Sequence, residues 1–458
     1  AHKTPARPII TMPSKLLAAT CLLASAAALK APTRLSKYVS PAQAVAAGGA
    51  VEGSKSSVTT STLNLAKNIV GSGVLALPAG VAACSTARKA SLPACGLIAV
   101  LGAISAYCFA LVGRACEATG TNSYRTAWEA SVGEGTGSLI TGITSFKTLV
   151  GCISYCIIIG DTATALAAST ALPALLKRRD VLLPLIGGGF LFPLSMLRDM
   201  KALAPASIIG LSGMLYTAGV CVWRALDGSY VVGKGRHALA LAASGSALPS
   251  FGAGASAGGA LLFVSMLATS YLAHYNAAAY YVELERPTLA RYNRVVYGGF
   301  AIAVAFFCSL TAAAHATFGK ASAGFILNSF AATDAFANAA RALVGLAVAC
   351  TYPLLFKGAR DGFFELTKAS PKAQEDLRTP ITVALTALSV LAGIVVTDLG
   401  FVVAFGGAVL GSAIIYILPT QIALAAAKKG KLALSGAEKK VCQGVRAMGY
   451  VLGALGAT

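Results

Sequence analysis

Residues 61–78 read STLNLAKNIVGSGVLALP, an apolar stretch of membrane length that Gly71-Ser72-Gly73 interrupts at its middle and Pro78 closes. Glycine offers no side chain for packing and is costly inside a helix, so two glycines around a serine favour local unwinding. Unwound backbone at membrane depth is tolerated only where protein buries it or water reaches it. The stretch therefore predicts a broken helix with a binding site at its break. A glycine packing face on an unbroken helix is the alternative.

The composition excludes a soluble globular fold, because 56% of the 458 residues are hydrophobic and only 12% are charged. A bilayer core of about 30 Å requires about 20 apolar residues in a helix, and such windows recur along nearly the whole chain. We expect an all-α polytopic membrane protein embedded in a lipid bilayer, with about 11 transmembrane helices. The second to eighth spans are expected at 92–116, 138–172, 181–197, 205–223, 258–282, 295–318 and 335–356. The ninth begins at Pro380, the tenth covers 400–427, and a short eleventh begins after Lys440.

The net charge of +20 lies in short basic clusters between apolar segments. This pattern is typical of cytoplasmic loops and of contact with anionic lipid headgroups, so we expect no nucleic-acid partner. Lys and Arg in alternate loops predict a cytoplasmic N-terminus, although the basic cluster 177–179 lies on the opposite side and argues against it. The eleven cysteines are scattered without a CxxC pair, which indicates packing residues and neither a disulfide framework nor a zinc site.

Residues 1–57 differ in kind from the membrane domain expected at 58–458. Residues 12–29 have the charged, apolar and small-residue layout of a signal peptide, and 30–50 are basic and nearly free of acids, as in organelle transit segments. We predict a disordered tail that contains a presequence, with an ordinary cytoplasmic tail as the alternative. An internal membrane, vacuolar or plastid, and the plasma membrane both stay open.

Four stretches resemble the amino acid/auxin permease family of the APC superfamily, which includes sodium-coupled neutral and proton-coupled amino acid transporters. They are NLAKNIVGSGVLALP at 64–78, PLSMLRDMKAL at 193–203, AHYNAAAYYVEL at 273–284, and Arg341 followed by TYP at 351–353. The resemblance covers roughly residues 58–455. It implies an eleven-helix, five-plus-five inverted-repeat fold (LeuT/APC-like), in which helices 1 and 6 are broken around an amino-acid site.

The predicted substrate site lies at these two breaks. Gly71, Ser72 and Gly73 are expected to offer backbone N–H and carbonyl groups to the carboxylate and ammonium of an amino acid, with the serine hydroxyl as a further donor. Ser270 and Tyr271 stand where the sixth helix is expected to break. No cofactor is expected besides a coupling ion.

By resemblance, Asn64 and Thr351 match positions that help to bind sodium in sodium-coupled members, and both supply hard, neutral oxygens. A possible sodium ion at these two residues is the only metal expected. The alternative for Thr351 is a hydroxyl that bonds back to its own helix. For Asn64 the alternative is a capping or packing role.

Three ionisable residues are candidates for proton coupling. Lys67 departs from the sodium-coupled pattern, and a lysine within a span costs roughly 2.5–3.5 kcal/mol, which indicates a function or a partner. Snorkelling to the interface is its alternative. Lys147 lies deeper, about four turns from Asp161 on one helix, so these two cannot pair directly. His274 can titrate near neutral pH, although a hydrogen-bonded structural histidine is the alternative.

These features favour a secondary active transporter, expected to be monomeric, that moves amino acids by alternating access with proton coupling. A sodium-coupled symporter, a non-transporting amino-acid sensor of the same fold and a channel are the rivals. No GxxxxGK[ST] phosphate loop appears, which argues against a primary pump, and a membrane enzyme is disfavoured because no metal-ligand cluster or HExxH motif lies at a membrane face.

Overall fold

The computed structural model describes residues 55–168, 170–198 and 204–456, and the predicted presequence and the turn at 199–203 lie largely outside them. The described chain is helical, and its only β-type pairings are three isolated bridges. Its first half contains α3 (Val58–Ile69), η2 (Ser72–Ala76), α4 (Leu77–Cys84), α5 (Ser91–Thr119), α6 (Tyr124–Ser131), α7 (Gly137–Ala168), η3 (Ala174–Lys177), α8 (Arg179–Ile186), η4 (Gly187–Leu191), α9 (Phe192–Met196), α10 (Ala204–Leu226) and α11 (Arg236–Ala243). Its second half contains α12 (Ala257–Ser270), η6 (His274–Asn276), α13 (Ala277–Val282), α14 (Leu289–Phe318), η7 (Ile326–Ser329), α15 (Ala335–Leu366), α16 (Pro371–Asp376), α17 (Arg378–Val395), α18 (Leu399–Gly406), η8 (Gly407–Ile417), α19 (Leu418–Lys428) and α20 (Gly436–Leu455).

Eight of the described helical stretches are long and apolar enough to cross a membrane, and α3 with η2 and α4 forms a ninth, bent span. The expected count of eleven therefore stays a prediction. The segment expected at 138–172 is a single helix of 32 residues, α7, which exceeds the bilayer core and must tilt or extend beyond it. The polar segment after α5 forms the short helix α6, which a Ser123–Thr126 capping box starts.

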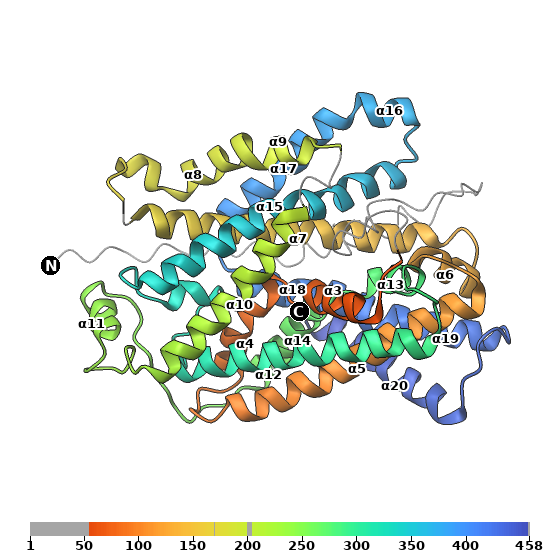
Figure 1. The fold of residues 1–458 in the computed structure, drawn as a ribbon, viewed down its shortest axis with the longest axis horizontal. Coiled ribbons are helices and arrows are strands. Elements are labelled where there is room, and N and C mark those ends of the chain that lie inside the picture. The colour runs from red at the N-terminus through yellow and green to blue at the C-terminus, as the bar shows by residue number, and fades with distance from the viewer. Residues whose placement is uncertain (1–54, 169, 199–203, 457–458) are drawn as a thin grey trace.

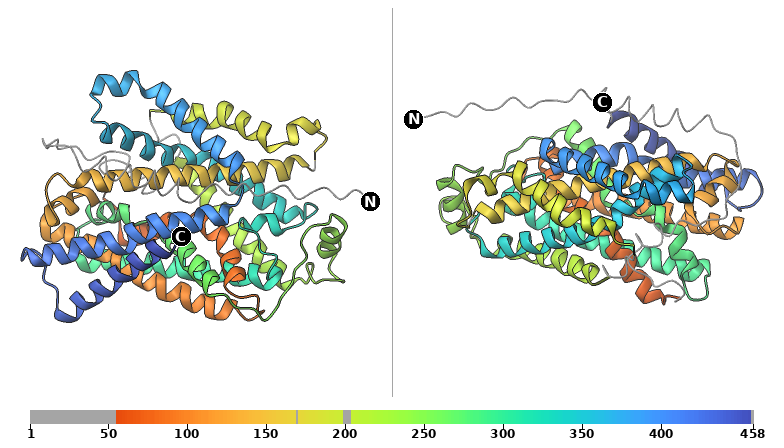
Figure 2. Two further views of the ribbon diagram at one scale, coloured as in Figure 1. Left: turned by 180° about the vertical axis from the view of Figure 1, so that it is seen from behind. Right: turned by 90° about the horizontal axis from the view of Figure 1, so that it is seen from above.

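The helices form two groups (Figure 1). One group contains α7, α8, α15 and α17, with α7 packed along α15. The other contains α5, α12, α14 and α20, which lie on the opposite side in both Figure 1 and the rear view of Figure 2. The helices α3, α4, α10 and α18 lie between the two groups, and α10 contacts both α14 and α15.

The first span is broken where the glycines predict it. Helix α3 ends at Ile69, Gly71 is extended (φ −108°, ψ −168°), and the chain continues as the 3₁₀ turn η2 into α4, bent by 42° from α3. Pro78 stands in the first turn of α4, where its missing N–H costs no helical bond.

The sixth span is broken at the matching place. Helix α12 ends at Ser270, and the short turn η6 leads into α13. The two breaks cross at Gly73, because a Cβ there would lie 3.0 Å from Ser270 Oγ and 3.2 Å from Ser270 Cα. A residue with a Cβ here would require the end of α12 to shift by a few tenths of an ångström, so glycine suits this close approach of η2.

Candidate functional site

A cavity of about 250 Å³ opens at the crossing of the two broken helices. Its apolar wall comes mainly from α10 and α15. Its polar lining comes from α3, η2, α7, α12, η6 and α15, and consists of Asn64, Lys67, Asn68, Ser72, Lys147, Ser154, Tyr155, Thr269, Ser270, Tyr275 and Thr351. Both glycines of the first break, Gly71 and Gly73, also line it.

The backbone of the first break faces this cavity. The first N–H groups of a helical turn and the last carbonyls of a helix have no partner within their own helix. Here α3 ends and η2 starts at the cavity wall. Ser72, the first residue of η2, is partly exposed. The arrangement suits a zwitterion, whose carboxylate accepts from N–H groups and whose ammonium donates to carbonyls.

Two lysines reach the cavity from different helices. Lys147 on α7 donates from Nζ to Tyr275 Oη at 3.1 Å, and its ammonium lies 4.5 Å from the centre of the Tyr275 ring. Lys67 on α3 is half-buried, and no ion pair involves either lysine within the described part of the chain. Asp161 instead pairs with Arg179 and accepts from Asn328 Nδ2 at 2.8 Å.

The two candidate sodium ligands both line the cavity, from α3 and from α15. The Thr351 hydroxyl donates to the Ala347 carbonyl of its own helix at 2.8 Å, which is the alternative role predicted for it. Its oxygen keeps a lone pair for a cation. No group of three or more His, Cys, Asp or Glu side chains gathers in a metal-binding arrangement among the residues that the structure covers.

Two predicted site residues lie outside the cavity. Tyr271 is fully buried and donates to the Ile98 carbonyl at 2.9 Å. His274 is also fully buried, with Nε2 2.8 Å from the Ser105 carbonyl and its ring edge-on to Phe109. The turn after α12 directs both side chains toward α5 and away from the cavity. This position favours the interpretation of His274 as a hydrogen-bonded structural histidine.

The same turn brings a residue into the site that sequence reasoning missed. Tyr275 lines the cavity and holds Lys147, while its neighbour His274 points away. Asn68 was missed as well, although it lies one helical turn after Asn64 and on the same face, which is a signal that the sequence contains. The Asn68 side chain hydrogen-bonds to Tyr280.

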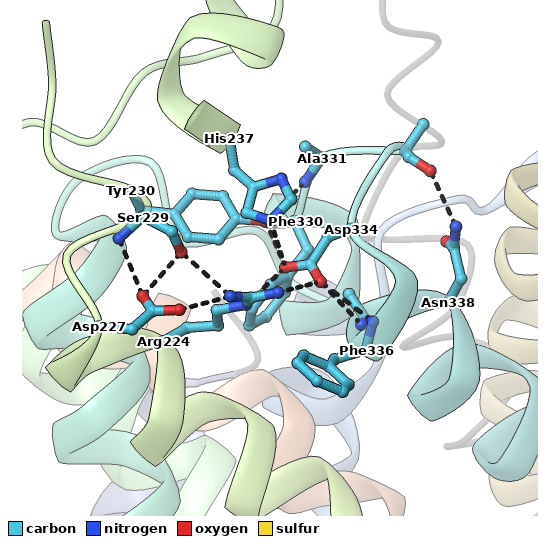
Figure 3. A network of polar contacts seen from close by, with 12 residues as sticks. Arg224, Asp227, Ser229, Tyr230, His237, Phe330, Ala331, Asp334, Phe336 and Asn338 are labelled. Carbon is cyan, nitrogen blue, oxygen red and sulfur yellow. Dashed lines mark hydrogen bonds and ion pairs between the residues drawn. The ribbon is translucent and has the colours of Figure 1, made fainter. Parts of the chain in front are cut away.

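A second polar site lies at the end of α10, near the start of α15 (Figure 3). Arg224 is 3% exposed, donates to both oxygens of Asp334 at 2.7 and 2.9 Å, and also pairs with Asp227. Tyr230 donates to Asp334 at 3.0 Å, and Asp334 caps α15 by accepting from the Phe336 amide at 3.1 Å. The network ties the connection between α10 and α12 to α15.

Electrostatics fix the protonation states of this network. Burial alone would raise the pKa of Asp334, but hydrogen bonds from Arg224 and Tyr230 outweigh it, so its pKa is lowered. Burial lowers the pKa of His237 more than Asp334 raises it, so this imidazole is neutral near pH 7, 3.8 Å from the carboxylate. Beside the network, Arg224, Arg236, His237, Thr333, Ala335 and Phe336 line an open hollow of about 420 Å³.

Comparison with known proteins connects the broken-helix cavity to a family. The family model described as transmembrane amino acid transporter protein matches residues 54–457. This chain belongs to that family. The predicted kinship with amino acid transporters is thereby confirmed, and the family together with the fold supports amino acid transport.

The relatives of this chain are distant in sequence but match it over most of its length. "Putative sodium-coupled neutral amino acid transporter 11" of Danio rerio is 26% identical over 386 residues, which cover 81% of this chain and 79% of the relative. "Vacuolar amino acid transporter 2" of Saccharomyces cerevisiae is 26% identical over 397 residues, which cover 82% and 78%. The solved inward-facing conformation of Mhp1 has a TM-score of 0.59 at 12% identity and covers 93% of this chain and 92% of Mhp1. This likeness confirms the predicted LeuT/APC-like fold.

Proposed function

We propose that this chain is a secondary active transporter that moves amino acids across a membrane by alternating access, with protons as the coupling ion. The observation that carries the proposal is the cavity at the crossing of the two broken helices, which Lys67 and Lys147 both line. The substrate binds at Gly71, Ser72, Gly73 and Ser270. Backbone groups freed by the breaks hold its carboxylate and ammonium, as in other carriers with discontinuous helices.

The lysines supply the coupling. A protonated Lys67 places a positive charge beside the break, where a sodium-coupled carrier would hold a metal cation. Release of that proton on the other side of the membrane weakens anion binding and frees the substrate. Lys147, held by Tyr275, is the second proton carrier.

Reconstituted protein tests this mechanism. We expect labelled amino acids to accumulate in liposomes under an imposed pH gradient, with no requirement for sodium, and Lys67→Ala to abolish the pH dependence. Lys67→Arg is the matched variant, because arginine keeps the charge and does not release its proton. If Lys67→Ala leaves the pH dependence unchanged, the assignment of the coupling residue is wrong.

Sodium coupling is the second candidate, because Asn64 and Thr351 bring two neutral oxygens to the same cavity and the zebrafish relative is named as sodium-coupled. Accumulation driven by a sodium gradient alone would establish it. A sensor of the same fold would bind amino acids without any uptake. The cytoplasmic N-terminus, the monomeric state, the presequence and the choice of membrane stay predictions.

A further inference from the structure

The charges that line the broken-helix cavity are all of one sign. Lys67 and Lys147 are the charged side chains among the described residues that line it, and no Asp or Glu accompanies them. Neither lysine forms an ion pair within the described part of the chain. Asp161, on the same helix as Lys147, lies 14 residues further along, roughly 21 Å at 1.5 Å per residue, and is already paired with Arg179.

An unpaired ammonium in a partly buried site is costly, so a carboxylate that binds there is favoured. A neutral amino acid brings one carboxylate and one ammonium, which leaves the excess positive charge of the two lysines unchanged. An amino acid with a carboxylate side chain brings one further negative charge. A cationic amino acid adds a positive charge and is disfavoured.

The donors also suit two carboxylates. The start of η2 at Ser72 serves the α-carboxylate, as for any amino acid. Lys147 comes from α7, a different wall, and Tyr275 fixes it with one of its three N–H bonds, which leaves two for a ligand. The cavity volume of about 250 Å³ fits a ligand of single amino-acid size.

We propose that this cavity selects acidic amino acids, with Lys147 as the residue that recognises the side-chain carboxylate of glutamate or aspartate. The inference rests on the proposed transport function and narrows it to a substrate class. It concerns the same cavity and gives Lys147, the second proton carrier proposed above, the further role of binding the side-chain carboxylate.

The test compares glutamate with glutamine, which differ in charge but hardly in shape. Proteoliposomes containing the full chain take up labelled glutamate, and unlabelled glutamate, aspartate, glutamine, leucine and lysine compete. We expect aspartate to compete at least 10-fold better than glutamine, and lysine not to compete. Lys147→Gln is expected to lower glutamate uptake at least 10-fold and to shift the preference toward glutamine, which a misfolded variant would not do. Lys147→Arg is expected to retain the preference for glutamate, and Lys440→Gln, at an exposed lysine of α20, is the matched control.

Three results are informative. Glutamate preference that Lys147→Gln reverses supports the inference. Uptake of glutamine or leucine equal to or above that of glutamate overturns it and leaves the transport function standing. Absence of uptake for every amino acid, under both proton and sodium gradients, overturns the transport function and the inference with it.

Discussion

Replacement of Gly73 by alanine tests the crossing of the two broken helices. The new Cβ would lie 3.2 Å from Ser270 Cα and 3.0 Å from Ser270 Oγ, closer than the usual carbon contact of about 3.5–4.0 Å. The Ser270 hydroxyl cannot move freely, because it donates to the Met266 carbonyl at 2.9 Å. Relief therefore requires a backbone shift at the end of α12.

Overpacking of this kind typically costs about 1–3 kcal/mol, which at about 1.4 kcal/mol per tenfold corresponds to a loss of roughly 5- to 140-fold in the population of the competent site. We expect Gly73→Ala to lower amino-acid uptake into liposomes within that range and to lower the melting temperature in detergent. Gly96→Ala is the matched control, since a Cβ at this glycine of α5 would meet nothing within 4 Å and Gly96 does not line the cavity. Its uptake is expected to stay near that of the wild type. Wild-type uptake and a wild-type melting temperature for Gly73→Ala would refute the assigned crossing, as would equal losses in Gly73→Ala and Gly96→Ala.

Three further predictions follow from the contacts around the site. Tyr275→Phe removes the hydrogen bond to Lys147 but keeps the ring. Hydrogen bonds to charged groups contribute about 1.5–3 kcal/mol, so we expect the KM for uptake to rise about 10-fold or more. An unchanged KM would contradict this role of Tyr275. Asp161→Asn leaves the partly buried Arg179, whose side chain is 16% exposed, without its counter-charge. The cost is expected to lie below the roughly 3–5 kcal/mol of a fully buried pair, so the melting temperature is expected to fall by a few degrees. A melting temperature equal to that of the wild type would show that the pair adds nothing. Asp334 has a lowered pKa in the folded protein, so its pairing stabilises the fold above about pH 4, its unfolded pKa, and this stabilisation is lost as the pH falls through the folded pKa. Melting temperatures of wild type and Asp334→Asn are therefore expected to converge at low pH, whereas a gap independent of pH would contradict this origin.

The break in the first span could be predicted from the sequence because its cause is local. Two glycines remove the side chains that would pack, and a proline closes the second half, so the chain itself encodes the interruption at Ser72. The membrane class likewise follows from composition, since long apolar windows have few alternatives in a chain with this little charge.

The lining of the second break could not be predicted in the same way. After α12 ends, the 3₁₀ geometry of η6 decides which side chains face α5 and which face the cavity, and contacts with α5 fix that rotation. Sequence reasoning therefore chose Tyr271 and His274 where the structure places Tyr275 in the cavity. The pairing of Arg224 with Asp334 spans 110 positions along the chain and depends wholly on tertiary packing.

Uptake of labelled amino acids by proteoliposomes that contain either the wild type or Ser72→Trp tests most directly whether the crossing of the broken helices is the transport site. Ser72 lines the cavity, and an indole there would occupy part of its volume of about 250 Å³. We predict that the wild type accumulates amino acid under an inward proton gradient, and that Ser72→Trp folds, melts near the wild-type temperature and accumulates none. Equal accumulation by the two proteins would place the substrate path elsewhere in the molecule.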